Sequence, residues 1–407
     1  MYAQKLDVHQ FEMYTFDLIM ILAYQHWRTA ALYLGIGALY TVYYLRYVVK
    51  NPVLACGNSK FQRLLQRCVP SLTKPYWPTF LGFGTHLQTV GHVAFQPFVG
   101  KHNYRSEKLS TIDGGEIILH WDDGQTSGNT ATPIGIIIPG LGGDSQSIYV
   151  KHMVDDVLSV GCRAVVFNQR GFGGAEIKTP RTFCAGSTDD IHFVLSHIHQ
   201  TYPDAPLLAN GASIGGIMLL NYLAEYGSRC VPLAGAMTVS VAWDLVESAK
   251  SLEKPVNSIL YNYTLTLNLI RLVKLKGLLF KDHYDLPSVF KSRSLREFDT
   301  HLTVKVFGYR DVHHYYSSSS PKGKLSKITV PTLCLNAADD AFSPIHTIPL
   351  NEAKRSPNVA IAMTSRGGHC GFMKGIFPSG GKTYMSEIFS EFVSAIFNEG
   401  KDYLSRD

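Results

Sequence analysis

The amino-acid sequence predicts an α/β protein built on a mostly parallel sheet. From about residue 111 onward, short apolar runs alternate with helix-prone segments, which is the pattern of strands joined by crossover helices. Glycine-rich turns directly follow two of these runs, at Pro139–Gly143 and Arg170–Gly174. The chain has 407 residues, of which 45% are hydrophobic and 17% are charged, so it is long and apolar enough to bury a large core.

The expected elements follow one another in a regular order. Each apolar run is short and bounded by turn residues, and each helix-prone segment is longer and carries apolar residues at helical spacing. The expected strands are 116–121, 134–139, 164–168, the run that begins at Leu207, 233–240, 332–336 and 359–364. The expected helices are 150–160, 188–201, 217–223, 256–275 and 383–397.

The alternation of strands and helices stops at about Val241 and resumes at Val330. The segment between them is helix-prone, notably over 256–275, and has no strand pattern. A helical insertion of this size in a parallel sheet is typical of a lid over a binding site, and we expect such a lid at about 242–325. The alternative is a helical excursion that only packs on the core.

The first 50 residues are expected to form an N-terminal segment with a single transmembrane helix at about 29–49. The run Thr29–Leu45 has no charged residue, and its 17 residues reach the lower limit for crossing a bilayer. A connector rich in proline and aromatic residues is expected over 51–110, followed by one catalytic domain over 111–407. The lysines and arginines after the span favour a cytosolic domain, whereas the sequon Asn262–Thr264 would be used only in the lumen, so the orientation stays open.

The most informative motif is Gly211-x-Ser213-x-Gly215, which lies between an apolar run and a helical pattern. A strand, a tight turn and a helix in this order form a nucleophile elbow, in which the serine hydroxyl is held out at the top of the sheet. The pattern alone is weak because glycine and serine are common. Its strand–turn–helix context favours Ser213 as a nucleophile.

A serine hydroxyl needs a base, and the base needs an acid to orient it. In the elbow fold these partners follow later strands, in the order acid and then histidine. His369 follows the run 359–364 within a glycine-rich turn, which singles it out from the other histidines. Asp339 and Asp340 both follow the run 332–336; we favour Asp340 as the acid because of its spacing to Pro344, and expect Asp339 to stabilise the loop.

Two backbone N–H groups are expected to stabilise the negative charge that forms on a substrate carbonyl oxygen. Ile214 follows the nucleophile at the start of a helix, and Leu141 lies in the glycine-rich turn after the run 134–139. These glycines are not followed by the Lys-Ser/Thr pair of a nucleotide-binding P-loop. The sequence therefore predicts an oxyanion hole formed by Leu141 and Ile214.

Other classes of function receive little support. The net charge of +6 is not clustered, which argues against nucleic-acid binding. The 7 cysteines are scattered without metal-ligand spacing. No metal and no cofactor is expected, and the sequence does not indicate an oligomeric state.

Several motifs together resemble the membrane-anchored α/β-hydrolase-domain family, and in particular the branch of abhydrolase domain-containing proteins 1 and 3. The motifs that carry this resemblance are Gly211–Gly216, Asp339–Pro344, Gly367–Phe372, Phe167–Gly171, Thr179–Thr182, Arg296–Asp299 and Phe307–Tyr309. The resemblance implies an α/β-hydrolase fold, an anchor in the endoplasmic reticulum or another membrane, and serine-hydrolase action on lipid esters, including phosphatidylcholines. Ala212 and Ile214 depart from the residues expected beside the nucleophile.

Three functions remain open from the sequence. The first is a serine hydrolase that cleaves phospholipid esters through an acyl-enzyme on Ser213, His369 and Asp340. The second is a membrane-tethered protein that binds a lipid or a hormone with little turnover. The third is an acyltransferase that uses the same three residues with an alcohol in place of water.

Overall fold

The computed structural model describes residues 8–95, 102–125, 129–275, 277–377 and 382–400. Parts of the expected N-terminal segment, connector, lid and catalytic domain lie outside these ranges. The chain divides into two compact units, residues 1–49 and 50–407. The first unit contains helix α1 (Val8–Tyr43) and a π-helical turn, η1 (Tyr44–Val48).

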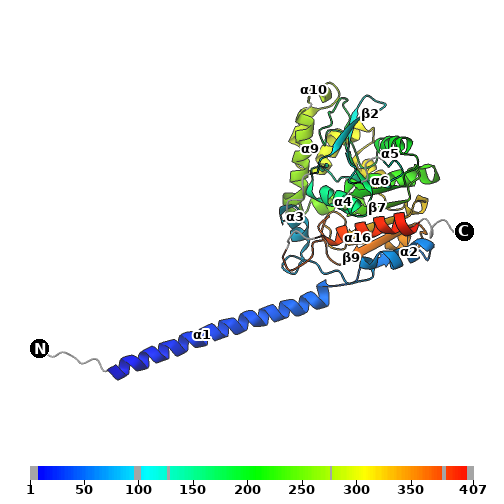
Figure 1. Ribbon diagram of the computed structural model, residues 1–407. Coiled ribbons are helices and arrows are strands. Elements are labelled where there is room, and N and C mark those ends of the chain that lie inside the picture. Colours follow the sequence, from blue (N-terminus) through cyan, green and yellow to red (C-terminus); the bar gives the residue numbers. More distant parts are fainter. Residues whose placement is uncertain (1–7, 96–101, 126–128, 276, 378–381, 401–407) are drawn as a thin grey trace. The chain divides into compact units, whose positions relative to one another are not determined.

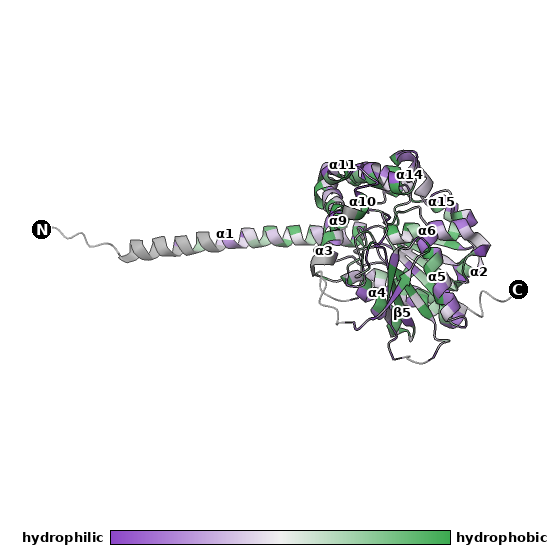
Figure 2. Cartoon of the chain, turned by 90° about the horizontal axis from the view of Figure 1, so that it is seen from above, coloured by the Kyte–Doolittle hydropathy of each residue, from purple (hydrophilic) through white to green (hydrophobic). Residues whose placement is uncertain are grey.

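The transmembrane helix expected at about 29–49 is not supported. Within the described ranges, no helix is both long enough and apolar enough to cross a membrane. The run Thr29–Leu45 is diluted by four tyrosines, two glycines and two threonines, and it is bounded by Arg28 and Arg46. Figure 2 shows residues of high and low hydropathy interspersed along the described part of α1.

The second unit is organised around a nine-stranded sheet in the order β1-β9-β8-β7-β6-β4-β5-β3-β2. The strands are β1 (Val53–Ala55), β2 (Arg105–Ser110), β3 (Glu116–Asp122), β4 (Ile134–Ile138), β5 (Arg163–Asn168), β6 (Leu207–Ala212), β7 (Gly235–Val239), β8 (Thr332–Ala337) and β9 (Val359–Thr364). The six central strands, β9, β8, β7, β6, β4 and β5, pair in parallel. At one edge β1 pairs antiparallel with β9, and at the other edge β3 pairs antiparallel with β5 and β2 pairs antiparallel with β3. The predicted, mostly parallel sheet is confirmed.

The region expected to be a connector, 51–110, contributes to the fold of the second unit. Its strand β1 pairs with β9, and its strand β2 pairs with β3. It also forms α2 (Lys60–Cys68) and α3 (Thr85–Phe95). Short segments such as Val53–Ala55 have no periodicity that separates them from loops, so their pairing depends on the neighbouring strand.

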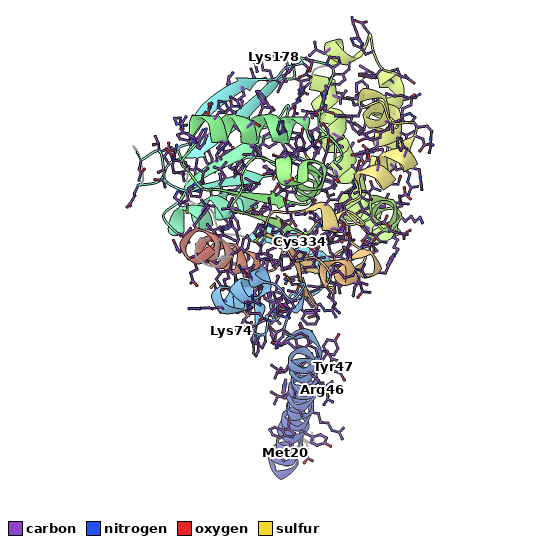
Figure 3. All side chains as sticks on the ribbon, turned by 90° about the vertical axis from the view of Figure 1, so that its right-hand side faces the viewer. Met20, Arg46, Tyr47, Lys74, Lys178 and Cys334 are labelled. Carbon is purple, nitrogen blue, oxygen red and sulfur yellow. The ribbon has the colours of Figure 1, made fainter. Side chains whose placement is uncertain are left out.

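Helices cover both faces of the sheet (Figure 1). Apolar residues of α2, α4 (Ile148–Ser159) and α16 (Tyr384–Ser394) pack on one face, and those of α5 (Asp189–Thr201) and α6 (Ile214–Tyr226) pack on the other. Buried β strands between two helical layers explain the nearly continuous apolar runs in the sequence. Figure 3 shows Cys334 of β8 inside this unit, whereas Lys178 lies at its surface.

Between β7 and β8 the described residues form helices and no strand. The α-helices of this insertion are α7 (Leu245–Leu252), α8 (Pro255–Asn257), α9 (Tyr263–Leu275), α10 (Gly277–Phe280), α11 (Leu286–Lys291), α12 (Leu295–Phe298), α13 (Val304–Val306) and α14 (Val312–Ser319). A further short helix outside the insertion, α15 (Leu350–Ala353), lies between β8 and β9. Apolar residues of this insertion, among them Val273, Phe280 and Leu302, form a third core cluster. The insertion therefore shares a separate core cluster with Ile177 and Phe183, which lie in the segment between β5 and α5.

A buried arginine ties three distant segments of the second unit together. The Arg170 guanidinium, at the end of β5, donates paired hydrogen bonds of 2.7 Å to Asp190 of α5. It also donates to both carboxylate oxygens of Asp113, in the turn between β2 and β3, at 2.7 and 2.9 Å. Its side chain is 3% exposed. These bonds hold the pKa of Asp113 well below its usual value.

Replacing Arg170 by methionine should lower the free energy of unfolding by about 3–5 kcal/mol, because two carboxylates lose their buried partner. Arg181→Met is the matched control, since its partner Asp189 is 70% exposed, and it should cost less than about 1 kcal/mol. Urea denaturation of both variants measures the difference. Equal losses in the two variants would contradict the importance of burial at Arg170.

Candidate active site

Ser213 lies in the sharp turn between β6, which ends at Ala212, and α6, which begins at Ile214. Its backbone adopts φ 52° and ψ −120°, a left-handed conformation that is costly for a residue with a side chain. The Ser213 N–H donates to Val239 O on the neighbouring strand at 2.9 Å. A side chain at Gly211 would lie 2.6 Å from Gly215 O, so the turn requires glycine there.

The structure brings Ser213, His369 and Asp340 together. His369 Nε2 lies 2.9 Å from Ser213 Oγ, and His369 Nδ1 lies 2.9 and 3.1 Å from the two carboxylate oxygens of Asp340. The Asp340 side chain is fully buried, and that of His369 is 12% exposed. A serine, a histidine and a buried aspartate in this chain of contacts have the geometry of a nucleophile, a general base and an orienting acid.

Asp339, the other candidate acid, points elsewhere. Its Oδ1 accepts a hydrogen bond of 3.0 Å from the Gly368 N–H, in the loop that carries His369. Burial raises the pKa of its carboxyl group to about 6. Asp339 therefore supports the histidine loop without contacting the imidazole of His369.

Two neighbours of His369 define the surroundings of its ring. Phe342 stacks on the imidazole with ring centres 3.9 Å apart. Cys370 follows His369 in the chain, and burial raises the pKa of its thiol to about 12. Because the thiolate is the reactive form of cysteine, Cys370 is not a competing nucleophile at neutral pH.

Helix α3 also contributes to this site, which no motif in the sequence predicts. The His369 N–H donates to Thr89 Oγ1 at 2.9 Å, and the Met373 N–H donates to Gln88 Oε1 at 2.7 Å. A side chain at Gly371 would overlap the Gln88 carbonyl oxygen, so helix and loop are in close contact. No local pattern in α3 indicates this role, since its partners lie about 280 residues away in the sequence.

Leu141 and Ile214 both lie at this site. Among the described residues, neither the Leu141 N–H nor the Ile214 N–H has a hydrogen-bond acceptor. The backbones of the two segments approach closely, because a side chain at Gly140 would lie 3.2 Å from Ser213 Cβ. Leu141 and Ile214 line the same cavity as Ser213, and two N–H groups without an acceptor are what an oxyanion would require.

A cavity of about 520 Å³ opens beside Ser213 and His369. Its walls are mainly apolar and come largely from the helices between β7 and β8, including Leu252, Leu269 and Val273. This volume lies within the range of about 300–1,000 Å³ that is usual for small-molecule sites. An apolar cavity whose wall includes Ser213 can hold an acyl chain with its carbonyl carbon near the serine hydroxyl.

The sequon asparagine is also part of this insertion. The Asn262 side chain is buried; its Oδ1 accepts a hydrogen bond of 2.8 Å from the Leu295 N–H, and its amide nitrogen donates to Leu252 O at 3.4 Å. A glycan on Asn262 could not be accommodated in this packing. Thus the folded structure offers no accessible acceptor at this sequon.

The site residues do not form a metal centre. Within the described part of the chain, no group of three or more histidine, cysteine, aspartate or glutamate side chains could hold a metal ion. His92 of α3 lines the cavity, and burial lowers its pKa to about 4. His92 is therefore neutral at physiological pH.

The fold and the site define a member of the α/β hydrolases. Residues 136–376 match the family model described as the alpha/beta hydrolase fold. The chain belongs to the α/β hydrolase fold family and, within it, to the abhydrolase-domain proteins. The resemblance in the sequence motifs is thereby confirmed.

Relatives with similar sequences extend over nearly the whole chain. The chain is 41% identical over 379 residues to the mouse (Mus musculus) protein named Phospholipase ABHD3, covering 91% of each chain. The human (Homo sapiens) Phospholipase ABHD3 matches with the same identity and coverage. A protein of Caenorhabditis elegans, abhd-3.2, is 32% identical over 344 residues and covers 84% of this chain and 90% of its own.

Asp340→Asn should lower kcat for ester hydrolysis by roughly 10³–10⁴-fold, because an asparagine holds the imidazole in the wrong tautomer. Asp339→Asn should lower kcat by less than about tenfold, because an amide oxygen can still accept the Gly368 N–H. Steady-state kinetics of the two purified variants on one soluble ester provides the comparison. The reverse ranking would assign the acid to Asp339.

Proposed function

We propose that this protein is a serine hydrolase that cleaves carboxylic esters of lipids, in particular phospholipids such as phosphatidylcholines. The observation that carries the proposal is the contact of 2.9 Å between Ser213 Oγ and His369 Nε2 in the wall of an apolar cavity. The relatives named as phospholipases support the same class of substrate.

The proposed reaction is acyl transfer in two halves. Ser213 Oγ attacks the ester carbonyl carbon and its proton passes to His369 Nε2, while the carbonyl π electrons move onto the oxygen. The Leu141 and Ile214 N–H groups stabilise this oxyanion, and Asp340 holds the imidazolium. The intermediate collapses, the C–O bond to the leaving alcohol breaks, and His369 returns the proton to that alcohol. Water then repeats these steps on the acyl-enzyme and releases the fatty acid.

Ser213→Ala should abolish labelling by a fluorophosphonate probe and lower kcat on phosphatidylcholine vesicles by roughly 10⁴–10⁶-fold, because the nucleophile is removed. The control is Ser228→Ala, which removes an exposed hydroxyl and should keep full activity. Gel-based probe labelling and release of free fatty acid are the measurements.

Three other outcomes would contradict the proposal. Wild-type turnover by the alanine variant would exclude Ser213 as the nucleophile. A wild-type protein that binds lipid without releasing fatty acid would be a binding protein. Transfer of the acyl group to an added alcohol in preference to water would identify an acyltransferase.

We also propose that residues 1–49 attach the protein to a membrane, that of the endoplasmic reticulum or another endomembrane. Large apolar side chains on α1 are exposed in near succession along the helix, including Leu32, Leu34, Ile36 and Leu39. Burial of such an apolar surface away from water is favourable, and the apolar part of a bilayer can bury it along the length of the helix.

Deleting residues 1–49 should reduce co-flotation with phosphatidylcholine vesicles by at least about tenfold, because each exposed apolar side chain adds to membrane affinity. Hydrolysis of a soluble short-chain ester should be unchanged, since Ser213, His369 and Asp340 all belong to the second unit. Equal flotation of the two proteins would refute attachment through this unit. A thermal melting curve checks that the shortened chain is folded.

A further inference from the structure

Tyr149 lies at the site without a role in the reaction described above. It occupies the first turn of α4, directly after the loop that carries Gly140 and Leu141. Its hydroxyl oxygen accepts a hydrogen bond of 2.7 Å from the Gly140 N–H. The side chain is partly buried and lines the same cavity as Ser213 and His369.

The Tyr149 hydroxyl lies close to the nucleophile. The position that a Cβ atom of Gly140 would take is 3.2 Å from Ser213 Cβ and 3.4 Å from Tyr149 Oη. A Cβ atom at Gly143 would overlap the same hydroxyl. Glycine at 140 therefore leaves room between the Ser213 side chain and the phenol, and glycine at 143 leaves room for the phenol itself.

The proton of this hydroxyl is available to a ligand. A phenol can accept one hydrogen bond and donate another, and the Gly140 N–H uses only the accepting side. Among the residues that the structure describes, none accepts a hydrogen bond from Tyr149 Oη. Burial raises the pKa of Tyr149 above its usual value, so the phenol keeps its proton at neutral pH.

We propose that the Tyr149 hydroxyl donates a third hydrogen bond to the oxyanion that forms when Ser213 attacks the substrate, beside the Leu141 and Ile214 N–H groups. This inference rests on the proposed acyl transfer. Tyr149 keeps its proton throughout, and its hydrogen bond strengthens as negative charge develops on the carbonyl oxygen. The bond from Gly140 to the phenol oxygen polarises the O–H group and makes it a better donor.

Tyr149→Phe should lower kcat on a soluble ester by roughly 10–100-fold and change KM by less than about twofold, because the lost bond is made mainly in the transition state. Tyr222→Phe is the matched control. Its phenol also accepts a backbone N–H, from Val231 at 2.9 Å, but it lies outside the cavity. Tyr222→Phe should keep the wild-type kcat, and wild-type kcat in Tyr149→Phe would overturn the proposal.

A second variant separates donation to the oxyanion from support of Gly140. Replacing Tyr149 by 3-fluorotyrosine makes the phenol more acidic, and hence a stronger donor and a weaker acceptor. Donation to the oxyanion predicts a kcat above that of the unmodified enzyme, by roughly twofold, at a pH where the phenol is protonated. An equal or lower kcat would overturn the proposal and leave Tyr149 with the positioning of Gly140 alone.

Failure of this proposal can be distinguished from failure of the proposed function. If the unmodified protein shows no turnover that depends on Ser213, no oxyanion forms and both proposals are wrong. Ser213-dependent turnover with no effect of Tyr149→Phe would remove only the third donor. Melting temperatures of the variants, compared with that of Tyr222→Phe, separate catalytic loss from loss of fold.

Discussion

The left-handed backbone at Ser213 is the constraint on which the site depends. A residue with a side chain in such a conformation costs on the order of 1–3 kcal/mol, which the surrounding packing must offset. Gly211 and Gly216 permit the close approach of β6 to α6, and Gly215 permits the close approach of α6 to the end of β4. The same turn starts α6 directly after the serine, and the Ile214 N–H is therefore left without an acceptor beside the hydroxyl.

The position of His369 depends on a part of the chain that is remote in sequence. Its loop contains Cys370 and Phe372, two residues other than glycine with positive φ. Hydrogen bonds hold this loop from three sides: from α3 through Thr89 and Gln88, from Ser240 after β7, and from Asp339 after β8. The contact of His369 with Ser213 thus results from the packing of the whole second unit.

The helices between β7 and β8 pack against Leu141 and Ile214, the two residues proposed to bind the oxyanion. Leu141 and Ile214 pack against the apolar cluster formed by these helices, and the same helices supply most of the cavity wall. A ligand that fills the cavity therefore contacts the side chains of the two residues whose N–H groups are proposed to bind the oxyanion. Tyr149 reaches the same space from α4, on the opposite side of the sheet from α6. The wall of the cavity that contains Ser213 therefore includes residues of α4 and of α6, one helix from each layer.

The sequence by itself determined the mostly parallel sheet, the succession of its main strands along the chain and the residues to be considered for catalysis. These features have local signals: apolar runs bounded by glycine, and Ser213, Asp340 and His369 each just after a strand. The roles of these three residues remain predictions, although the structure brings them into contact. Only the tertiary structure decided that 51–110 supplies two edge strands and α3, and that Tyr149 lines the same cavity as Ser213. The physical reason is that the contact of Thr89 with His369, or of Tyr149 with Gly140, depends on packing between segments whose local patterns are those of ordinary helices.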